Sequence, residues 1–395
     1  MITVEQVWEI IAAQVRALPG EPIASTECAG RVLRENVTAR ENNPPFNQSA
    51  VDGYAFAEGG TNGWLLVSGT DCAGDMSTGP LHKGEARRIL TGGVVPPGTA
   101  FIAKEEDCVA DEGHVTPPSD HEPGGFIRPS GGVWPAGEML LPAGTRLGAG
   151  DAGLLAALGY EQITATRQPS VLHLVTGNEI HRGSGAPPAG MVRDSNGPLI
   201  AALCRASGVK IHQQWTKDEA DSINSAVAAS REDVILISGG SGRSERDFAR
   251  PALSAAGFVI HVDGVDTRPG RPFILGQRGA QVALGLPGNP LSHFVCYHIF
   301  FRAVFAALQG AKRQPLRQGI LHGAARAGGD GRRTWLPAKL VFTDRGTTQL
   351  EPLEWVHSGD LRPVAEAGAL ISMEGGTAAS SGTLVPFLDL AFAER

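Results

Sequence analysis

One stretch decides the fold of the middle of the chain: Asp233-Val-Ile-Leu-Ile-Ser-Gly-Gly-Ser-Gly242. Its nearly unbroken apolar run is typical of a strand that is covered on both faces, as in a parallel sheet. The glycines that follow let backbone N–H groups approach an anion closely. Because ligands bind beyond the carboxyl ends of strands in open parallel sheets, the stretch predicts a buried strand that ends in a ligand loop.

Strands and helices alternate regularly on both sides of this stretch. Further strands are predicted at 171–175, 209–215, 258–262 and 281–286, and helices at 196–206, 218–230, 247–256 and 290–308. Ser195 or Asn196 is the expected N-cap of the first helix, and Gly208 follows its end. The alternation predicts a doubly wound, mostly parallel α/β sheet with right-handed crossovers.

The rest of the chain does not continue this alternation of strands and helices. Residues 3–18 predict an amphipathic helix, residues 44–128 are rich in short strand-like runs, residues 152–159 predict a short helix, and β texture returns after about residue 315. We therefore predict an α/β plus β multidomain protein. Its expected parts are 1–43 with 129–168 as a discontinuous N-terminal domain, 44–128 as an inserted β domain, 169–312 as the α/β domain, and 313–395 as a C-terminal β domain.

Composition narrows the functional class. The 395 residues carry a formal net charge of -7 without a long basic run, which disfavours nucleic-acid binding through a basic face. We expect neither a signal peptide, since Met1-Ile-Thr-Val-Glu5 has no basic start, nor an apolar window long enough for a membrane span. The five cysteines lie far apart and none forms a C-x-x-C pair, so we expect reduced thiols in the cytoplasm and no structural zinc site.

Three strand ends carry special loops: Thr176-Gly-Asn-Glu179, Ser238-Gly-Gly-Ser-Gly242 and Gly285-Leu-Pro-Gly-Asn-Pro290. Each glycine alone could simply make a tight turn. Three such loops at one sheet edge favour an anion site, and Pro290 suits the first turn of the helix that follows. Neither a Walker A motif nor a G-x-G-x-x-G after the first strand of this domain is present, which disfavours an ATPase and a nicotinamide dehydrogenase.

Charged residues lie beside these loops. The turn Arg268-Pro-Gly-Arg-Pro272 presents two guanidinium groups that suit an oxyanion, although a solvated basic turn is the usual alternative. Carboxylates near the loops and in the β region suit Mg²⁺ held against a phosphate; they are Asp52, Glu179, Asp194 and Asp247. Each of them alone is more often a helix cap or a surface acid, and Asp194, directly before Ser195-Asn196, is a strong capping candidate. His173 lies inside an apolar strand and is expected to be structural.

Taken together, the motifs resemble molybdopterin molybdenumtransferase, the MoeA and gephyrin E-domain family. Besides the loops and the arginine turn, the stretches that carry the likeness are Pro44–Ala55, Arg88–Glu106, Asp194-Ser-Asn196 and Ser358-Gly-Asp-Leu361. The resemblance covers nearly the whole chain in the same order. It implies a four-domain homodimer with a barrel-like C-terminal domain, and an active site between the α/β domain of one subunit and the C-terminal β domain of the other.

The resemblance also implies an activity and roles for individual residues. The family hydrolyses adenylylated molybdopterin with a divalent metal such as Mg²⁺, releases AMP, and inserts molybdenum from molybdate. The matching catalytic and metal-binding positions are Asp52, Glu179 and Asp247. Those for the pterin and adenylate are Thr91, Asp194, Ser195, Gly239, Gly240, Pro287, Gly288, Asn289 and Pro290, and those for molybdate are Arg268, Arg271, Pro272, Ser292, Arg332 and Ser358. A molybdopterin adenylyltransferase and apo-molybdoenzymes are the implied protein partners, with no nucleic acid and no membrane.

The chain departs from the family pattern near the implied site. Arginines stand at 268 and 271 where the family has lysines, the loop 239–244 reads Gly-Gly-Ser-Gly-Arg-Ser, Gly131-Gly-Val133 replaces a Gly-Glu-Asp, and Asn47-Gln48 replaces an Asp-Asn. These changes leave three hypotheses: an active molybdenum insertase, a molybdopterin-binding carrier or scaffold without catalysis, and an enzyme for another pterin or nucleotide ligand. The retained Asp52, Glu179, Asp247 and Arg332 favour the first.

Overall fold

The computed structural model describes residues 1–59, 63–76, 79–241, 248–342 and 348–391. The chain forms two compact units. Unit 1 consists of Met1–Glu35, Gly144–Gly153 and Gln162–Arg395, and unit 2 of Asn36–Ala143 and Leu154–Glu161. The predicted boundaries at 43/44 and 128/129 fall inside unit 2, and those at 168/169 and 312/313 fall inside unit 1.

The centre of unit 1 is a six-stranded sheet in the order β16-β13-β17-β21-β20-β18. The strands are β13 (Ser170–Thr176), β16 (Lys210–Thr216), β17 (Val234–Ser238), β18 (Val259–Asp263), β20 (Ile274–Arg278) and β21 (Gln281–Leu286). The first four in the sheet order are mutually parallel, and β20 runs antiparallel to both its neighbours. The predicted mostly parallel α/β sheet is confirmed, and β17 is buried along its whole length as its apolar sequence requires.

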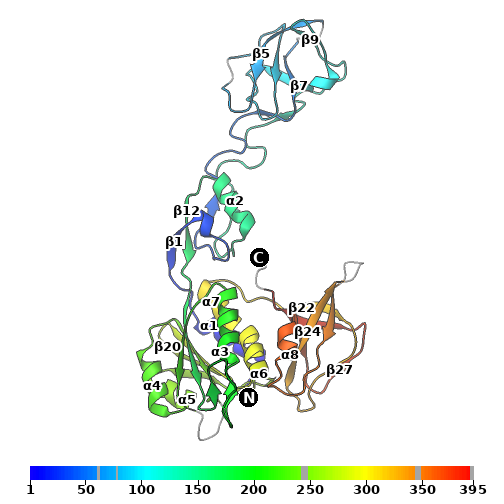
Figure 1. Cartoon of the computed structure of the whole chain (residues 1–395). Helices are drawn as coiled ribbons and strands as arrows, with labels where there is room; N and C mark the ends of the chain where they lie inside the picture. The colour runs from blue at the N-terminus through cyan, green and yellow to red at the C-terminus, as the bar shows by residue number, and fades with distance from the viewer. Residues whose placement is uncertain (60–62, 77–78, 242–247, 343–347, 392–395) are drawn as a thin grey trace. The chain divides into compact units, whose positions relative to one another are not determined.

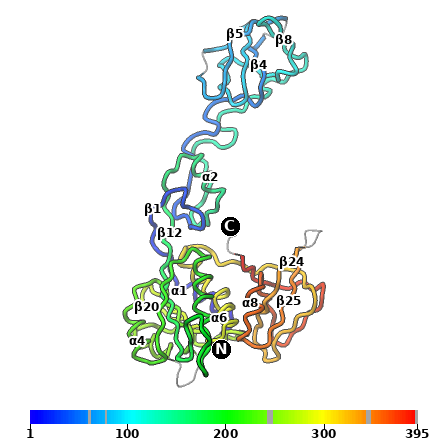
Figure 2. Tube along the Cα trace, viewed as in Figure 1, coloured from blue at the N-terminus to red at the C-terminus, as the bar shows by residue number. Residues whose placement is uncertain are grey.

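Helices cover both faces of this sheet (Figure 1). On one face, α4 (Ala220–Ala229) and α5 (Ala249–Ala255) pack with the sheet around Ile223, Leu253 and Ile235. On the other face lie α3 (Asn196–Ala206), the long helix that starts at Pro290, and α1 (Val4–Gln14). Although α1 comes first in the sequence, it packs beside the end of the long helix (Figure 2). The N-terminal helix is thereby part of the core of unit 1.

The predicted helix 290–308 contains an irregularity in its middle. It consists of α6 (Pro290–Cys296), a π-helical turn (Tyr297–Phe301) and α7 (Arg302–Gln309), and Gly310 ends it with a φ of 72°. The Ile299 carbonyl in the π turn accepts a 2.6 Å hydrogen bond from Trp8 Nε1. Our expectation that no apolar window reaches the length of a membrane span is wrong for this helix. Its apolar window is 83% buried, because it forms the core between the sheet and its neighbours.

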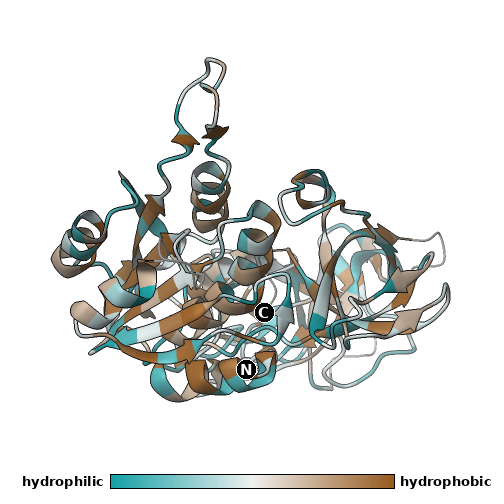
Figure 3. Cartoon of the chain, turned by 90° about the horizontal axis from the view of Figure 1, so that it is seen from below, coloured by the Kyte–Doolittle hydropathy of each residue, from teal (hydrophilic) through white to brown (hydrophobic). Residues whose placement is uncertain are grey.

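The C-terminal part of unit 1 is a β barrel. It consists of β22 (Arg317–Leu321), β24 (Arg333–Phe342), β25 (Thr348–Pro352), β26 (Ala369–Met373) and β28 (Leu384–Asp389), with α8 (Arg362–Glu366) before β26. Pairing of β24 with both β25 and β26 closes the barrel around an apolar interior that includes Leu336, Leu350 and Ile371. The predicted barrel-like domain is confirmed. Apolar residues gather along the strands of the barrel and along those of the α/β sheet (Figure 3).

A short strand joins the two parts of unit 1. β19 (Thr267–Arg268) leaves the α/β domain and pairs in parallel with β24, with Thr267 opposite Arg333 and Arg268 opposite Thr334. The buried cluster that contains Leu291 and Tyr297 of the long helix also contains Trp335 and Leu388 of the barrel. The arginine turn therefore lies against the barrel of its own chain.

Unit 2 contains the inserted β domain. Its sheet has the order β7-β4-β6-β5-β9-β8 and is built from β4 (Gly53–Ala57), β5 (Leu65–Asp71), β6 (Glu85–Ile89), β7 (Thr99–Lys104), β8 (Val109–Asp111) and β9 (His114–Thr116). Small apolar clusters cover both faces of β4, whose five residues are all buried. The β character predicted for 44–128 is confirmed.

Candidate functional site

The three predicted loops begin at neighbouring strand ends. β13, β17 and β21 are adjacent in the sheet, and their register places Val175 opposite Ser238 and Ser238 opposite Leu286. The loops also bond to one another, since Thr176 Oγ1 donates to the Ser238 carbonyl at 3.0 Å and the Gly239 N–H to the Leu286 carbonyl at 3.2 Å. The sheet therefore brings the loops to one edge.

Glycine is required at the start of the middle loop. Gly239 and Gly240 have φ values of 88° and 59°, which side chains rarely adopt. A Cβ at Gly239 would lie 3.0 Å from Thr176 Oγ1, so the backbones of the first two loops can approach only because that Cβ is absent. Residues 242–247, which include the predicted Asp247, lie outside the described residues.

Helix α3 starts beside the third loop. Ser195 occupies its N-cap position without a side-chain cap, and the carboxylate of Asp194 does the capping instead by accepting the Gly197 N–H at 2.8 Å. Asp194 also accepts from Trp215 Nε1 at 2.9 Å, and Asn196 Nδ2 donates to the Gly288 carbonyl at 2.7 Å. Glu179 is exposed at the end of the first loop. The loops and the start of α3 thus form one connected surface.

A buried polar network lies beneath this surface, and sequence reasoning did not find it. Ser238 Oγ, at the end of β17, is hydrogen-bonded to His173 Nε2 and, at 2.6 Å, to His293 Nε2. Gln213 Nε2 lies 3.0 Å from His173 Nδ1 and donates to the Gly197 carbonyl at 2.8 Å. Burial lowers the pKa of His173 to about 3 and that of His293 to about 4, so both imidazoles are neutral at pH 7. The network ties β13, β17, α3 and α6 together under the loops.

The start of α6 meets the C-terminal domain. Pro290 occupies the first turn, as predicted, and Ser292 is buried next to it. The Leu291 N–H, in the same turn, donates to the Ser358 carbonyl at 2.9 Å. Ser292 and Ser358, two predicted molybdate ligands, are thereby brought to neighbouring backbone positions within one chain.

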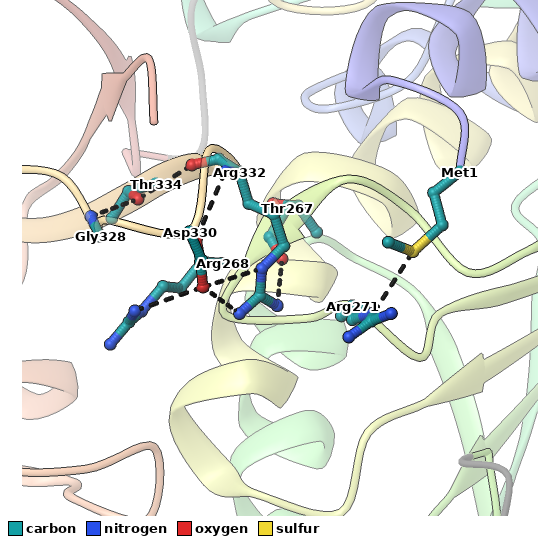
Figure 4. A network of polar contacts seen from close by, with 8 residues as sticks. All are labelled: Met1, Thr267, Arg268, Arg271, Gly328, Asp330, Arg332 and Thr334. Carbon is teal, nitrogen blue, oxygen red and sulfur yellow. Dashed lines mark hydrogen bonds and ion pairs between the residues drawn. The ribbon is translucent and has the colours of Figure 1, made fainter. Parts of the chain in front are cut away.

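The arginine turn packs against both parts of unit 1 (Figure 4). A Cβ at Gly270 would lie 2.6 Å from Cys296 Sγ, so the turn rests closely on α6. Arg332 Nη1 donates to the Thr267 carbonyl at 3.4 Å, and both Arg268 and Arg332 reach the carboxylate of Asp330. Arg271 is exposed, and its Nε contacts Met1 Sδ at 3.3 Å. Arg332 thus contacts the arginine turn of its own chain. A contribution of a second subunit to the active site stays a prediction.

Asp52 and Thr91 come together in unit 2. Asp52 Oδ1 accepts hydrogen bonds from the backbone N–H and from Oγ1 of Thr91, both at 2.7 Å. These two bonds lower the pKa of the Asp52 carboxyl, the backbone bond having the larger effect. Asp52 is therefore fixed in orientation and ionised at neutral pH.

The positions that depart from the family pattern in unit 2 have structural partners. Asn47 Oδ1 accepts the Ser130 N–H at 2.8 Å, directly before Gly131-Gly-Val133. Gly131 has a φ of 75°, and the Val133 N–H donates to the Asn43 carbonyl at 2.8 Å. These residues hold two passing chain segments together.

Within the described ranges, no three His, Cys, Asp or Glu side chains lie close enough together to hold a metal ion. Asp52 belongs to unit 2, Glu179 belongs to unit 1, and Asp247 lies outside the described residues, so the three-carboxylate centre implied by the resemblance stays a prediction. All five cysteines are free, and burial raises the pKa of Cys108 to about 11 and that of Cys204 to about 12, which excludes both as thiolates at neutral pH.

A mostly parallel α/β domain with three loops at one sheet edge, joined through an arginine turn to a C-terminal β barrel, defines a class of multidomain α/β plus β proteins. Three sequence families match the chain: the MoeA N-terminal region (domain I and II) over residues 2–159, a probable molybdopterin binding domain over 173–307, and the MoeA C-terminal region (domain IV) over 323–390.

Similar proteins agree with these matches. A molybdopterin molybdenumtransferase of Nostoc sp. is 30% identical over 91% of this chain and 86% of its own length, and one of Staphylococcus aureus is 25% identical over 95% and 92%. The crystal structure of a molybdopterin biosynthesis MoeA protein from Pyrococcus horikoshii covers 100% of both chains at 24% identity with a TM-score of 0.82, which supports the fold. The chain belongs to the MoeA family of molybdopterin molybdenumtransferases. The predicted family, fold class and transferase assignment are confirmed.

Proposed function

We propose that this chain inserts molybdenum from molybdate into adenylylated molybdopterin with release of AMP, as a step of molybdenum cofactor biosynthesis. The observation that carries the proposal is the placement of two anion-binding features in one compact unit of a MoeA-family chain. The three-loop edge suits a phosphate, and the arginine turn suits a tetrahedral oxyanion.

The three-loop edge holds the phosphate end of the pterin in this proposal. Backbone N–H groups at a helix start and a glycine nest bind anions without a full positive charge. Gly288 supports this role, because a Cβ there would meet nothing within 4 Å and both Gly288 and Asn289 are exposed. The residues proposed to contact the pterin and adenylate are those expected from the resemblance: Thr91, Asp194, Ser195, Gly239, Gly240, Pro287, Gly288, Asn289 and Pro290.

The arginine turn and the residues facing it hold molybdate. Arg268, Arg271 and Arg332 supply fixed positive charge, which a dianion requires, and guanidinium forks bind oxyanions in a bidentate way. Ser292 and Ser358 lie where the barrel meets α6, and Pro272 closes the turn. In the proposed reaction the two dithiolene thiols of molybdopterin form bonds to molybdenum through their sulfurs, and their two protons leave with one molybdate oxygen as one water molecule.

The acidic residues Asp52, Glu179 and Asp247 act on the adenylate, and Mg²⁺ is the proposed ion that they bind. The two hydrogen bonds from Thr91 keep the Asp52 carboxylate ionised and fix its orientation. An ionised, oriented carboxylate is suited to accept a proton as a general base or to bind a divalent cation. We further propose a cytoplasmic homodimer that receives its substrate from a molybdopterin adenylyltransferase and serves apo-molybdoenzymes, without binding nucleic acid or membrane.

The test is release of AMP from adenylylated molybdopterin by the purified protein with Mg²⁺ and molybdate. The proposal predicts AMP formation that depends on the protein and is lost in Asp52→Ala. A carrier or scaffold would instead retain bound ligand and release no AMP. An enzyme for another ligand would be revealed if mass spectrometry of the co-purifying small molecule found a different pterin or nucleotide.

A further inference from the structure

A carboxylate lies between the two guanidinium groups that are proposed to bind molybdate (Figure 4). Asp330 Oδ2 accepts a hydrogen bond from Arg332 Nε at 3.0 Å and another from Arg332 Nη2, and it lies 3.4 Å from Arg268 Nη1. Asp330 Oδ1 accepts the backbone N–H of Arg332 at 3.3 Å. Both oxygens therefore face donors that an oxyanion would use.

The fold holds this carboxylate in place from several directions. Arg268 is fixed by the pairing of β19 with β24, and a Cβ at Gly328 would lie 2.6 Å from Arg268 Nη1, so the loop before Asp330 packs directly on the guanidinium. Thr334 Oγ1 accepts the Gly328 N–H at 3.1 Å and donates to the Arg332 carbonyl at 3.2 Å, which ties the two ends of that loop together. Strand pairing and the Thr334 hydroxyl therefore hold the loop that carries Asp330 against Arg268.

Charge and bonding favour an ionised aspartate at this position. Hydrogen bonding from the Arg332 side chain is the main cause that lowers the pKa of Asp330. The carboxylate is only about one-third exposed, at 34%, and the Arg332 side chain only 23%. Asp330 cancels one of the two positive charges of the Arg268–Arg332 pair, so this pair presents its full charge to an oxyanion only when the carboxylate is displaced.

We propose that Asp330 is an internal counter-ion that occupies the Arg268–Arg332 pair in the absence of substrate and must be displaced by the incoming oxyanion, so that it sets the affinity of the site. This inference rests on the proposed function of the arginine turn. Displacement costs the exposed ion pairs of Asp330, so removing this competitor raises oxyanion affinity by about fivefold, which corresponds to about 1 kcal/mol in total.

The experiment measures binding of sodium molybdate and of sodium tungstate to the full chain by isothermal titration calorimetry at one fixed ionic strength. The variants are Asp330→Asn, Asp330→Ala and, as the matched control, Glu374→Gln. Glu374 pairs with the neighbouring Arg333, so its substitution removes the same charge without touching Arg268 or Arg332. Thermal unfolding confirms that each variant is folded.

The inference predicts that both Asp330 variants bind both oxyanions about fivefold more tightly than the wild type, while Glu374→Gln stays within twofold of it. Unchanged or weaker binding in both Asp330 variants, with normal binding in the wild type, overturns the counter-ion role and leaves the proposed function intact. An equal gain in Glu374→Gln overturns it as well, because the effect would then be one of net charge. No binding to any of the four proteins overturns the proposed molybdate site itself.

Discussion

The contacts of single residues decide how the arginine turn is held. Gly328 and Gly329 are neighbours in the loop before Asp330, but only Gly328 lies against Arg268, a proposed molybdate ligand. A Cβ at 328 would be 2.6 Å from Arg268 Nη1 and 2.9 Å from its Cδ, whereas a Cβ at 329 meets nothing within 4 Å. The pair offers a test of whether the position of Arg268 matters.

We predict that Gly328→Ala weakens molybdate binding about three- to tenfold, because the added methyl group displaces the Arg268 guanidinium. A half-exposed ion pair between a guanidinium and an oxyanion contributes roughly 1 kcal/mol to binding. Gly329→Ala serves as the control and should bind like the wild type. Titration calorimetry measures both. Equal affinities in the two variants would show that Arg268 takes no part in binding.

A second residue-scale prediction concerns Thr91 and Asp52. The hydroxyl of Thr91 lowers the pKa of Asp52, so Thr91→Val removes one of the two bonds to Oδ1 and raises that pKa. If AMP release needs ionised Asp52, the acid side of its pH profile moves to higher pH in Thr91→Val. Thr99→Val removes a hydroxyl that is bonded only to the Pro96 carbonyl, and its profile should not move. Identical profiles for all three proteins would contradict the role of Asp52.

At the scale of elements, a buried hydrogen-bond network connects the strand ends from beneath. Ser238, at the end of β17, is hydrogen-bonded to His173 on β13 and to His293 on α6, so buried hydrogen bonds connect three neighbouring elements. Such a network stabilises the fold only while both imidazoles are neutral, since protonation would place positive charge in the core without a counter-ion.

We therefore predict that the α/β domain loses stability on acidification. An unfolded histidine titrates near 6.5, whereas the folded pKa is about 3 for His173 and about 4 for His293, so the unfolded chain binds more protons below pH 6.5. Each histidine then costs about 2 kcal/mol of unfolding free energy at pH 5 and nothing above pH 7.5. Hydrogen exchange of peptides from β13 and β17, corrected for the intrinsic rate, measures the loss.

The control for this prediction is the exposed His212, whose side chain is 68% accessible. His212→Gln should keep the full dependence on pH, and His173→Gln should lose about 2 kcal/mol of it at pH 5, because the proton of His173 is no longer taken up on unfolding. A pH dependence that survives unchanged in His173→Gln would contradict the account of the network.

Much of the element arrangement was predictable from local pattern, and the failures have physical causes. Apolar runs such as Val234–Ile237 predicted their strands because parallel strands are buried on both faces. The strand β20 was missed, because Ile274–Arg278 follows the proline- and glycine-rich turn closely and has only Gly279-Ala280 before the next strand. The π turn in the long helix has no local signal either, since the bond from Trp8 to Ile299 depends on packing of the N-terminal helix.

The candidate site was predictable in part for the same reason. Residues at strand ends and in the arginine turn are recognisable because their chemistry and position are local properties of the sequence. Asp330 is one acid in a glycine-rich loop, and its contact with Arg268 arises only when β19 pairs with β24. The Ser238 network likewise requires three elements that are far apart in sequence. Side-chain contacts that depend on tertiary structure therefore could not be predicted from the local sequence.

At the scale of the whole molecule, the structure places the proposed molybdate ligands in one unit of one chain. Arg268, Asp330 and Arg332 contact each other within that chain. Mixing Arg268→Gln protomers with Arg332→Gln protomers should then restore no molybdate binding. If the two arginines met across a dimer interface instead, mixed dimers would each regain one intact site, and about a quarter of the wild-type capacity would return.

The central claim is that the loop edge and the arginine turn act together on adenylylated molybdopterin and molybdate. The most direct measurement quantifies, in one reaction of the purified wild-type protein, the AMP released and the active molybdenum cofactor formed, the latter by reconstitution of an apo-molybdoenzyme. The account predicts both products in a one-to-one ratio, with cofactor formation lost in Arg268→Gln. Cofactor formation that is unaffected by Arg268→Gln, or neither product from the wild-type protein, would contradict it.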